Sequence, residues 1–192
     1  MEQILGHRDL VEFFVKLLDK YKINYLLTGS FAVSYYGHPR ATHDIDFIVE
    51  IKKKGSAKIL EAIKELGTNF VVDASQIKEA VLNSLEFNIL HTQTGIKLDF
   101  WIVEKNEFEQ NKFKRKKAIF IDKQKINLIS AEDLILTKLL WCKTLKSERH
   151  LQDCVGILEV QKNKLDKVYL DKCINKLELE ELFKEISTQE YY

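Results

Sequence analysis

The chain is poor in the residues that mark flexible linkers, disulfide frameworks and membrane spans. Its 192 residues include a single proline and seven glycines, which argues against a disordered linker. The three cysteines (Cys142, Cys154 and Cys173) form no CxxC or Cys/His cluster, so a zinc site is not expected. They stand in apolar helical patterns, which favours buried free thiols in a reducing cytoplasm. There is neither a signal peptide nor an apolar run near the roughly 18 residues of a membrane span, so we expect a cytoplasmic protein without a membrane partner.

An excess of charge of one sign is also missing from the chain as a whole. Lysine and arginine number 30 and aspartate and glutamate 29, so the whole molecule is not an obvious polyanion binder. Basic residues do concentrate in one segment, 112–125, which holds seven of them and one acid, Asp122. The seven are Lys112, Lys114, Arg115, Lys116, Lys117, Lys123 and Lys125. Such runs are common on surfaces, so the segment predicts a solvated loop or edge, and a phosphate-attracting patch is the alternative.

The pattern of apolar residues predicts a mixed α/β half followed by a helical half. Apolar residues at helical period indicate helices over 8–20 and 56–66. Shorter apolar or alternating runs predict strands over 23–28, 44–49, 85–91, 96–103 and 125–129. From Ser130 onward helices are predicted over 134–145, 151–160, 167–176 and 178–186. We therefore expect an α+β protein with one domain over 1–129 and a C-terminal helical region over 130–192.

Three aspartates are predicted to lie on one face of the sheet. Asp44 and Asp46 are two residues apart on one strand, so both side chains point to the same side. Asp99 stands on a later strand, on the face opposite the apolar Leu98 and Phe100. If the two strands are neighbours, three carboxylates converge. A cation relieves the repulsion between such groups, and oxygen ligands of this kind suit Mg²⁺ or Mn²⁺.

A glycine turn precedes the aspartate pair. The first predicted strand ends at Gly29, and a helix begins at Ser30. A strand that turns at glycine into a helix presents backbone N–H groups and the positive end of a dipole to an anion, and the serine adds a hydroxyl donor. An Asp-x-Asp pattern alone is usually an ordinary strand end. A phosphate cradle about 15 residues before such a pair instead predicts nucleotidyl transfer.

The segment LLTGSFAVSYYGHPRATHDIDFIVE resembles the signature of the polymerase-β-like nucleotidyltransferase superfamily. That signature is a Gly-Ser turn, a short helix and Asp-x-Asp, with a third aspartate on a later strand. The run from Arg40 through Thr42 to the pair is closest to the minimal bacterial stand-alone branch, which includes the AbiEii-like toxins. The resemblance runs from about 25 to 160. It implies a mixed sheet flanked by helices and followed by a helical bundle.

The resemblance also assigns roles in the first half of the chain. It implies that Gly29 and Ser30 hold the phosphates of a nucleotide triphosphate and that Asp44, Asp46 and Asp99 hold Mg²⁺ or Mn²⁺. Asp99 would also accept the proton of the attacking hydroxyl. Arg40 and Thr42 are expected to contact the nucleotide. For Arg40 the alternative is a solvated loop position.

The helical half carries weaker matches to the same branch. In SAEDLILTKLLWCKTLKSERHLQDCVGIL, Lys138, Arg149 and Asp153 occupy the positions of its later motifs. The match implies that Lys138 reaches the triphosphate and that Asp153 orients Lys138 or contacts the nucleotide. A lysine that extends its ammonium to solvent is the alternative for Lys138. Gly156 stands where the AbiEii-like toxins often have a second acid, a departure from the toxin pattern.

The sequence therefore predicts a metal-dependent nucleotidyltransferase. It would move a nucleoside monophosphate from an NTP to a hydroxyl acceptor and release pyrophosphate. Two further alternatives stay open on these residues. One is a toxin of a toxin–antitoxin pair that acts on tRNA and has a cognate antitoxin. The other is a catalytically inactive nucleotide-binding module. A small-molecule hydroxyl acceptor is also compatible with the sequence.

Overall fold

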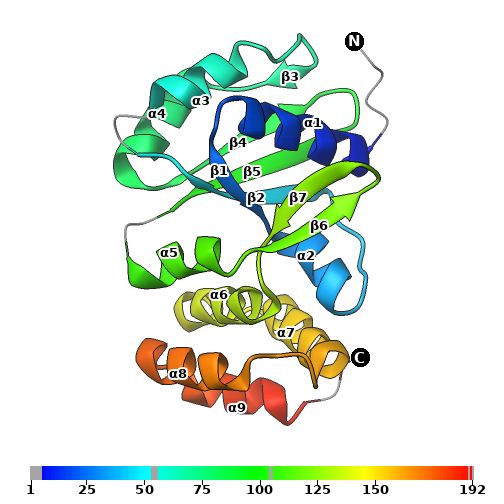
Figure 1. Cartoon of the computed structure of the whole chain (residues 1–192), viewed down its shortest axis with the longest axis vertical. Coiled ribbons are helices and arrows are strands. Elements are labelled where there is room, and N and C mark those ends of the chain that lie inside the picture. The colour runs from blue at the N-terminus through cyan, green and yellow to red at the C-terminus, as the bar shows by residue number, and fades with distance from the viewer. Residues whose placement is uncertain (1–5, 53–55, 104–105, 190, 192) are drawn as a thin grey trace. The chain divides into compact units, whose positions relative to one another are not determined.

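The computed structural model describes residues 6–52, 56–103, 106–189 and 191, and it separates into two compact units (Figure 1). The first unit comprises Met1–Ser30 and Ala41–Leu128, and the second comprises Phe31–Arg40 and Ile129–Tyr192. The chain passes between the units within helix α2 (Gly29–Tyr36). The domain division predicted at residue 129 does not include this interleaving of residues 31–40 with the C-terminal half.

The first unit is built on a mixed sheet with the strand order β3-β4-β5-β2-β1-β7-β6. Its described strands are β1 (Asn24–Leu27), β2 (Asp44–Glu50), β3 (Phe70–Val71), β4 (Glu86–His91), β5 (Ile96–Ile102), β6 (Lys117–Ile121) and β7 (Gln124–Leu128). Strand β2 runs parallel to β5, and β1 runs parallel to β7. The other neighbours are antiparallel. The two aspartate-bearing strands are therefore neighbours, which is the condition under which the three carboxylates were expected to converge.

One face of the central strands is apolar and carries a ladder of three aromatic rings. Phe47 of β2 stacks on Phe100 of β5, with ring centroids 5.3 Å apart. Phe100 stacks in turn on Phe87 of β4 at 4.9 Å. Phe14 of helix α1 (His7–Lys20) packs against Phe100 at 5.6 Å. All four rings are buried, so the apolar face predicted for this strand is confirmed, and the polar residues between the rings point the other way.

Helices α3 (Ser56–Ile63) and α4 (Ala74–Asn83) contact each other in the first unit, and the basic segment begins in α5 (Glu107–Lys114). The expectation that 112–125 is a loop or edge is wrong at its start. The side chain of Lys112 is buried, and its ammonium lies 2.6 Å from Glu109 Oε1 and over the ring of Phe108. From Lys117 onward the segment lies in the β6–β7 hairpin, and the outer strand β6 is at the end of the strand order, as an edge would be.

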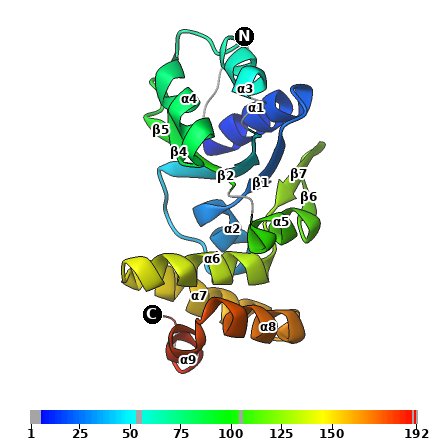
Figure 2. The same ribbon diagram turned by 90° about the vertical axis from the view of Figure 1, so that its left-hand side faces the viewer.

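The second unit is helical (Figure 2). Its helices after residue 129 are α6 (Ala131–Thr144), α7 (Glu148–Gln161), α8 (Lys167–Leu177) and α9 (Glu180–Ser187), and α6 contacts the other three. The predicted start at Ser130 is confirmed, because its hydroxyl accepts the N–H of Asp133 at 3.1 Å. Cys142 and Cys154 are buried as expected, whereas Cys173 is half-exposed. No helix in the described ranges combines the length and the hydropathy that a membrane crossing needs.

Two glycines let helix α7 approach the end of α2. A Cβ on Gly37 would lie 3.0 Å from the backbone carbonyl carbon of Gly156 and 3.0 Å from the backbone nitrogen of Ile157. A Cβ on Gly156 would in turn lie 3.0 Å from the ring of His38. A larger side chain at Gly156 would therefore require the rings of His38 and Tyr191 to shift.

We expect Gly37→Ala to lower the free energy of unfolding by about 1–3 kcal/mol, because the new methyl group meets backbone atoms that do not give way. Gly6→Ala is the matched control, since a Cβ there meets no atom of the described residues within 4 Å. Thermal unfolding of both variants measures the difference. Equal melting temperatures for the two would contradict the close packing of Gly37.

Candidate active site

The register of β2 and β5 brings the predicted acids together on the polar face of the sheet. Asp46 is the direct neighbour of Asp99, and Asp44 is the neighbour of Lys97. Asp44 is exposed, Asp46 is half-buried, and Asp99 is buried at 8% of its full exposure. The three predicted aspartates therefore lie on one face of two adjacent strands.

A lysine already neutralises one of these acids. The ammonium nitrogen of Lys97 lies 2.9 Å from Asp99 Oδ2. Burial raises the pKa of Asp99 above its ordinary value, while the ammonium of Lys97 acts in the opposite direction. The hydrogen bond to Asp99 in turn raises the pKa of Lys97. Asp99 is thus ion-paired within the protein.

The acidic face suits a hard divalent cation in its chemistry. All three groups are carboxylates, and Mg²⁺ prefers such oxygen ligands. Within the ranges that the structure describes, however, no three acidic, histidine or cysteine side chains are placed to hold a metal ion as they stand. The backbone register fits a metal site, and the side chains must turn toward one another, with Asp99 leaving Lys97, to complete it.

The Gly-Ser turn is fitted against Asp46. Gly29 has a φ of +60°, in the left-handed region that favours glycine. A Cβ at this position would lie 1.8 Å from Asp46 Oδ2 and 2.7 Å from Asp46 Cβ. The backbone N–H of Thr28 also donates to the carbonyl oxygen of Asp46 at 2.9 Å. The turn and the carboxylate therefore form a single local structure.

Two buried hydroxyls flank this glycine. Thr28 and Ser30 are 1% and 4% exposed, and neither side-chain oxygen has a hydrogen-bond partner among the residues that the structure describes. Buried polar groups are normally hydrogen-bonded, so a pair without partners needs an explanation. They stand at the N-terminus of α2, where backbone N–H groups favour an anion. Thr28 was not among the predicted site residues, although a threonine that ends an apolar strand directly before Gly-Ser is the signal for it.

A second cluster of predicted residues lies in the helical unit. Arg40 donates to both carboxylate oxygens of Asp153, from Nε at 2.8 Å and from Nη2 at 3.1 Å. Lys138 Nζ donates to Asp153 Oδ2 at 2.8 Å. Burial acts to raise the pKa of Asp153, but the hydrogen bonds and charges of Arg40 and Lys138 outweigh it and hold that pKa below its ordinary value. The cluster is an ion triad with two cations on one carboxylate.

The geometry distinguishes between the roles considered for these residues. The side chain of Lys138 is 2% exposed and its ammonium is paired internally, so it does not extend to solvent. Asp153 accepts a hydrogen bond from Lys138, a contact compatible with its predicted orienting role, which stays a prediction. The guanidinium of Arg40 is directed at Asp153 rather than into a solvated loop. Contacts of Lys138, Asp153 and Arg40 with a nucleotide stay predictions.

Thr42 and Arg149 have simpler surroundings. The Thr42 hydroxyl accepts the backbone N–H of Asp44 at 3.1 Å, which fixes the start of β2. Its predicted contact with the nucleotide stays a prediction. Arg149 is exposed on the first turn of α7.

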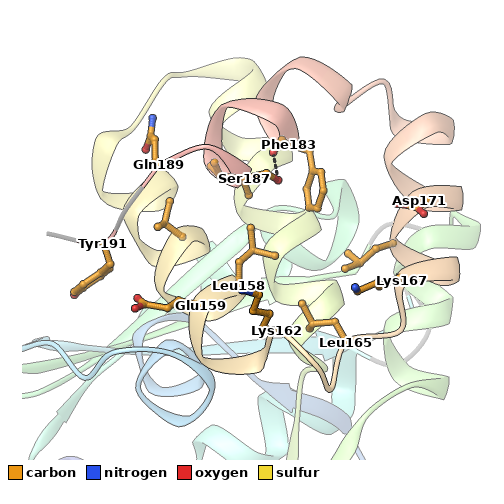
Figure 3. A pocket seen from close by; sticks show the side chains of 13 residues that line it. Leu158, Glu159, Lys162, Leu165, Lys167, Asp171, Phe183, Ser187, Gln189 and Tyr191 are labelled. Atoms are coloured by element: carbon orange, nitrogen blue, oxygen red, sulfur yellow. Dashed lines mark hydrogen bonds between the residues drawn. The ribbon is translucent and has the colours of Figure 1, made fainter.

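A cavity of about 700 Å³ lies within the helical unit (Figure 3). It is bordered by α7, α8, α9 and the residues that follow α9. Its lining includes the apolar Leu158 and Phe183 and the charged Lys162 and Lys167. None of the predicted site residues lines it.

The chain also matches a known family over most of its length. The family model described as "Nucleotidyl transferase AbiEii toxin, Type IV TA system" matches residues 14–189. No curated protein sequence matches the chain.

Solved structures share the fold at low sequence identity. An antigenic nucleotidyltransferase-like protein from Paracoccidioides brasiliensis has a TM-score of 0.54 at 15% identity, with 95% of this chain and 93% of that chain covered. The lincosamide antibiotic adenylyltransferase LnuA, with lincomycin bound, has a TM-score of 0.52 at 16% identity, covering 82% and 99%. ANT(2")-Ia in complex with adenylyl-2"-tobramycin has a TM-score of 0.58 at 12% identity, covering 88% and 95%. These likenesses confirm the predicted α+β nucleotidyltransferase fold.

Proposed function

The chain belongs to the AbiEii family of nucleotidyltransferases, and on that premise we propose that it transfers a nucleoside monophosphate from an NTP to a hydroxyl acceptor with the help of a divalent cation. The observation that carries this proposal is the placement of the Gly29 turn directly against Asp46, with two buried hydroxyls beside it that have no partner within the described ranges. In this proposal the site that binds the triphosphate is therefore adjacent to the acidic site that binds the cation.

In this proposal the triphosphate occupies the N-terminus of α2. The backbone N–H groups of the first turn and the hydroxyls of Thr28 and Ser30 donate hydrogen bonds to phosphate oxygens. Gly29 leaves room for a phosphate to approach the backbone. The two buried hydroxyls then obtain the partners that they lack in the protein alone.

Asp44, Asp46 and Asp99 are the residues that would hold Mg²⁺ or Mn²⁺. The cation would neutralise charge on the triphosphate and on the leaving pyrophosphate. An acceptor oxygen forms a bond to the α-phosphorus, and the bond from that phosphorus to the bridging oxygen of the pyrophosphate breaks. We assign the proton of the acceptor hydroxyl to a carboxylate oxygen of Asp99, the most buried of the three acids.

For the acceptor we propose a biological setting from the family. The family model describes a toxin of a type IV toxin–antitoxin system, so a cognate antitoxin is the expected partner. RNA, in particular tRNA, is one candidate acceptor. The β6–β7 hairpin favours it, because it exposes Phe120 (69% exposed) opposite Lys125, and exposed aromatic and basic side chains together suit a nucleic acid. LnuA is known with lincomycin bound and ANT(2")-Ia in complex with adenylyl-2"-tobramycin, so a small-molecule hydroxyl is the other candidate.

The test is incubation of the purified protein with each α-labelled NTP, Mg²⁺ and total cellular RNA. We expect label to move to the acceptor with the wild type, and we expect Asp44→Asn to reduce the rate by about a thousandfold or more, since it removes a carboxylate from the cation site. Asp9→Asn, an exposed aspartate of α1, is the matched control and should keep full activity. An Asp44→Asn protein with normal activity would rule out the mechanism.

The destination of the label separates the acceptors. Label in tRNA identifies RNA as the acceptor. Binding of triphosphate without transfer to RNA points to a small molecule. Absence of triphosphate binding contradicts the proposed donor site and favours an inactive scaffold protein.

A further inference from the structure

A lysine stands among the three acids of the proposed cation site. Lys97 lies two residues before Asp99 on β5, so both side chains point to the polar face. Its Cα is the register partner of Asp44 on the neighbouring strand. Its ammonium lies 2.9 Å from Asp99 Oδ2. The polar face thus contains its own cation beside the oxygens that would bind a metal ion.

The ammonium and a metal ion need the same oxygens. Asp99 is largely buried, so it has few directions from which a cation can approach, and Lys97 occupies one of them. The charges of Asp99, Asp44 and Glu86 all act on Lys97. A divalent ion that approaches Asp99 would therefore find one carboxylate oxygen already bound by Lys97, and the nearby ammonium would repel it.

The pair is suited to exchange rather than to permanent closure. The side chain of Lys97 is 46% exposed, so its ammonium can turn to solvent when another cation takes its place on Asp99. Water competes for the ammonium at this exposed end of the pair and weakens the pair. A divalent cation, with twice the charge, can displace such an ammonium.

We propose that Lys97 competes with the divalent cation for Asp99 and so sets the metal concentration at which the three-carboxylate site fills. This inference rests on the proposed function of the same site. It also accounts for the arrangement of the acids in the described residues, which share one face without closing around a common point. Until a cation arrives, Lys97 prevents the uncompensated charge that Asp99 would otherwise carry.

The experiment is a titration with Mn²⁺ alone, with free Mn²⁺ measured by electron paramagnetic resonance. We expect Lys97→Met to lower the dissociation constant for Mn²⁺ by about tenfold, because the competing charge is removed at short range. Lys78→Met, which removes an exposed lysine of α4, is the control for net charge and should change the constant little.

The double variant tests the pair itself. In an Asp99→Asn background the effect of Lys97→Met should shrink to that of Lys78→Met, because the carboxylate for which Lys97 competes is gone. Equal dissociation constants for the wild type and Lys97→Met would overturn the competition and leave the proposed function intact. An effect of the same size in both backgrounds would also overturn it. If neither the wild type nor any variant binds Mn²⁺, the proposed cation site fails, and the competition fails with it.

Discussion

Replacing Gly29 by alanine is expected to lower nucleotidyl transfer by about a hundredfold or more while the protein remains folded. The added methyl group would lie 1.8 Å from Asp46 Oδ2, so the carboxylate must leave its position. Displacing a catalytic group by about 1 Å can reduce a rate about a hundredfold. The methyl group also fills the space through which a phosphate would reach the backbone. Steady-state transfer rates and thermal unfolding, measured on the same preparation, give both quantities.

Gly95 offers a control for the backbone contribution. It has a φ of +67°, close to that of Gly29, but a Cβ there meets nothing within 4 Å. Gly95→Ala therefore introduces the same conformational strain, about 1 kcal/mol, without the collision. It should lower stability slightly and leave transfer unchanged. If Gly95→Ala reduced the rate as much as Gly29→Ala, the contact with Asp46 would not be the cause.

Replacing Asp153 by alanine is expected to lower the free energy of unfolding by about 3–5 kcal/mol, the usual cost when one partner of a buried ion pair is removed. The variant leaves the ammonium of Lys138, 2% exposed, without its carboxylate. It also removes the two carboxylate oxygens that accept from the guanidinium of Arg40, which is 22% exposed. Chemical denaturation monitored by circular dichroism measures the loss.

A rescue variant separates stability from activity. Asp153→Leu combined with Lys138→Met replaces the buried pair by apolar side chains and should recover much of the stability. Glu178→Ala breaks the exposed pair with Lys143 and should leave the free energy of unfolding almost unchanged. A loss after Asp153→Ala no larger than that after Glu178→Ala would show that the triad does not stabilise the fold. If the double variant regains stability without activity, the triad has a role beyond packing.

The parts of the fold that could be predicted from sequence are those that local pattern determines. Strict alternation in β5 places Leu98 and Phe100 in the core and Asp99 on the opposite face, as observed. The start of α6 at Ser130 follows from its capping chemistry. The parallel pairing of β2 with β5 was not predicted, because alternation alone does not say which strands are neighbours or in which direction they run.

The remaining features depend on contacts between distant parts of the chain. The guanidinium of Arg40 pairs with Asp153, which is 113 residues away in the sequence, and no local pattern reveals that pairing. Burial of Lys112 required helix α5, whose apolar face is too narrow to be evident in a lysine-rich run. The pairing of Lys97 with Asp99 follows from the strand face that was predicted, yet a shared face alone does not establish an ion pair. Thr28 was not predicted, because its hydroxyl becomes a candidate for ligand binding only when it is known to be buried.

The aromatic ladder, on the opposite side of the sheet from the acids, helps to fix the register that places Asp46 beside Asp99. The rings of Phe47 and Phe100 are consecutive with Asp46 and Asp99 on their strands, and both pairs are register neighbours. A slip of either strand by one residue would drive a carboxylate into the core and a phenyl ring into water at the same time. A misaligned sheet is thus destabilised both by the buried carboxylate and by the exposed phenyl ring. A conservative substitution of Phe47 or Phe100 can therefore alter the alignment of Asp46 with Asp99, and with it the chemistry of the acidic face, although no polar residue is changed.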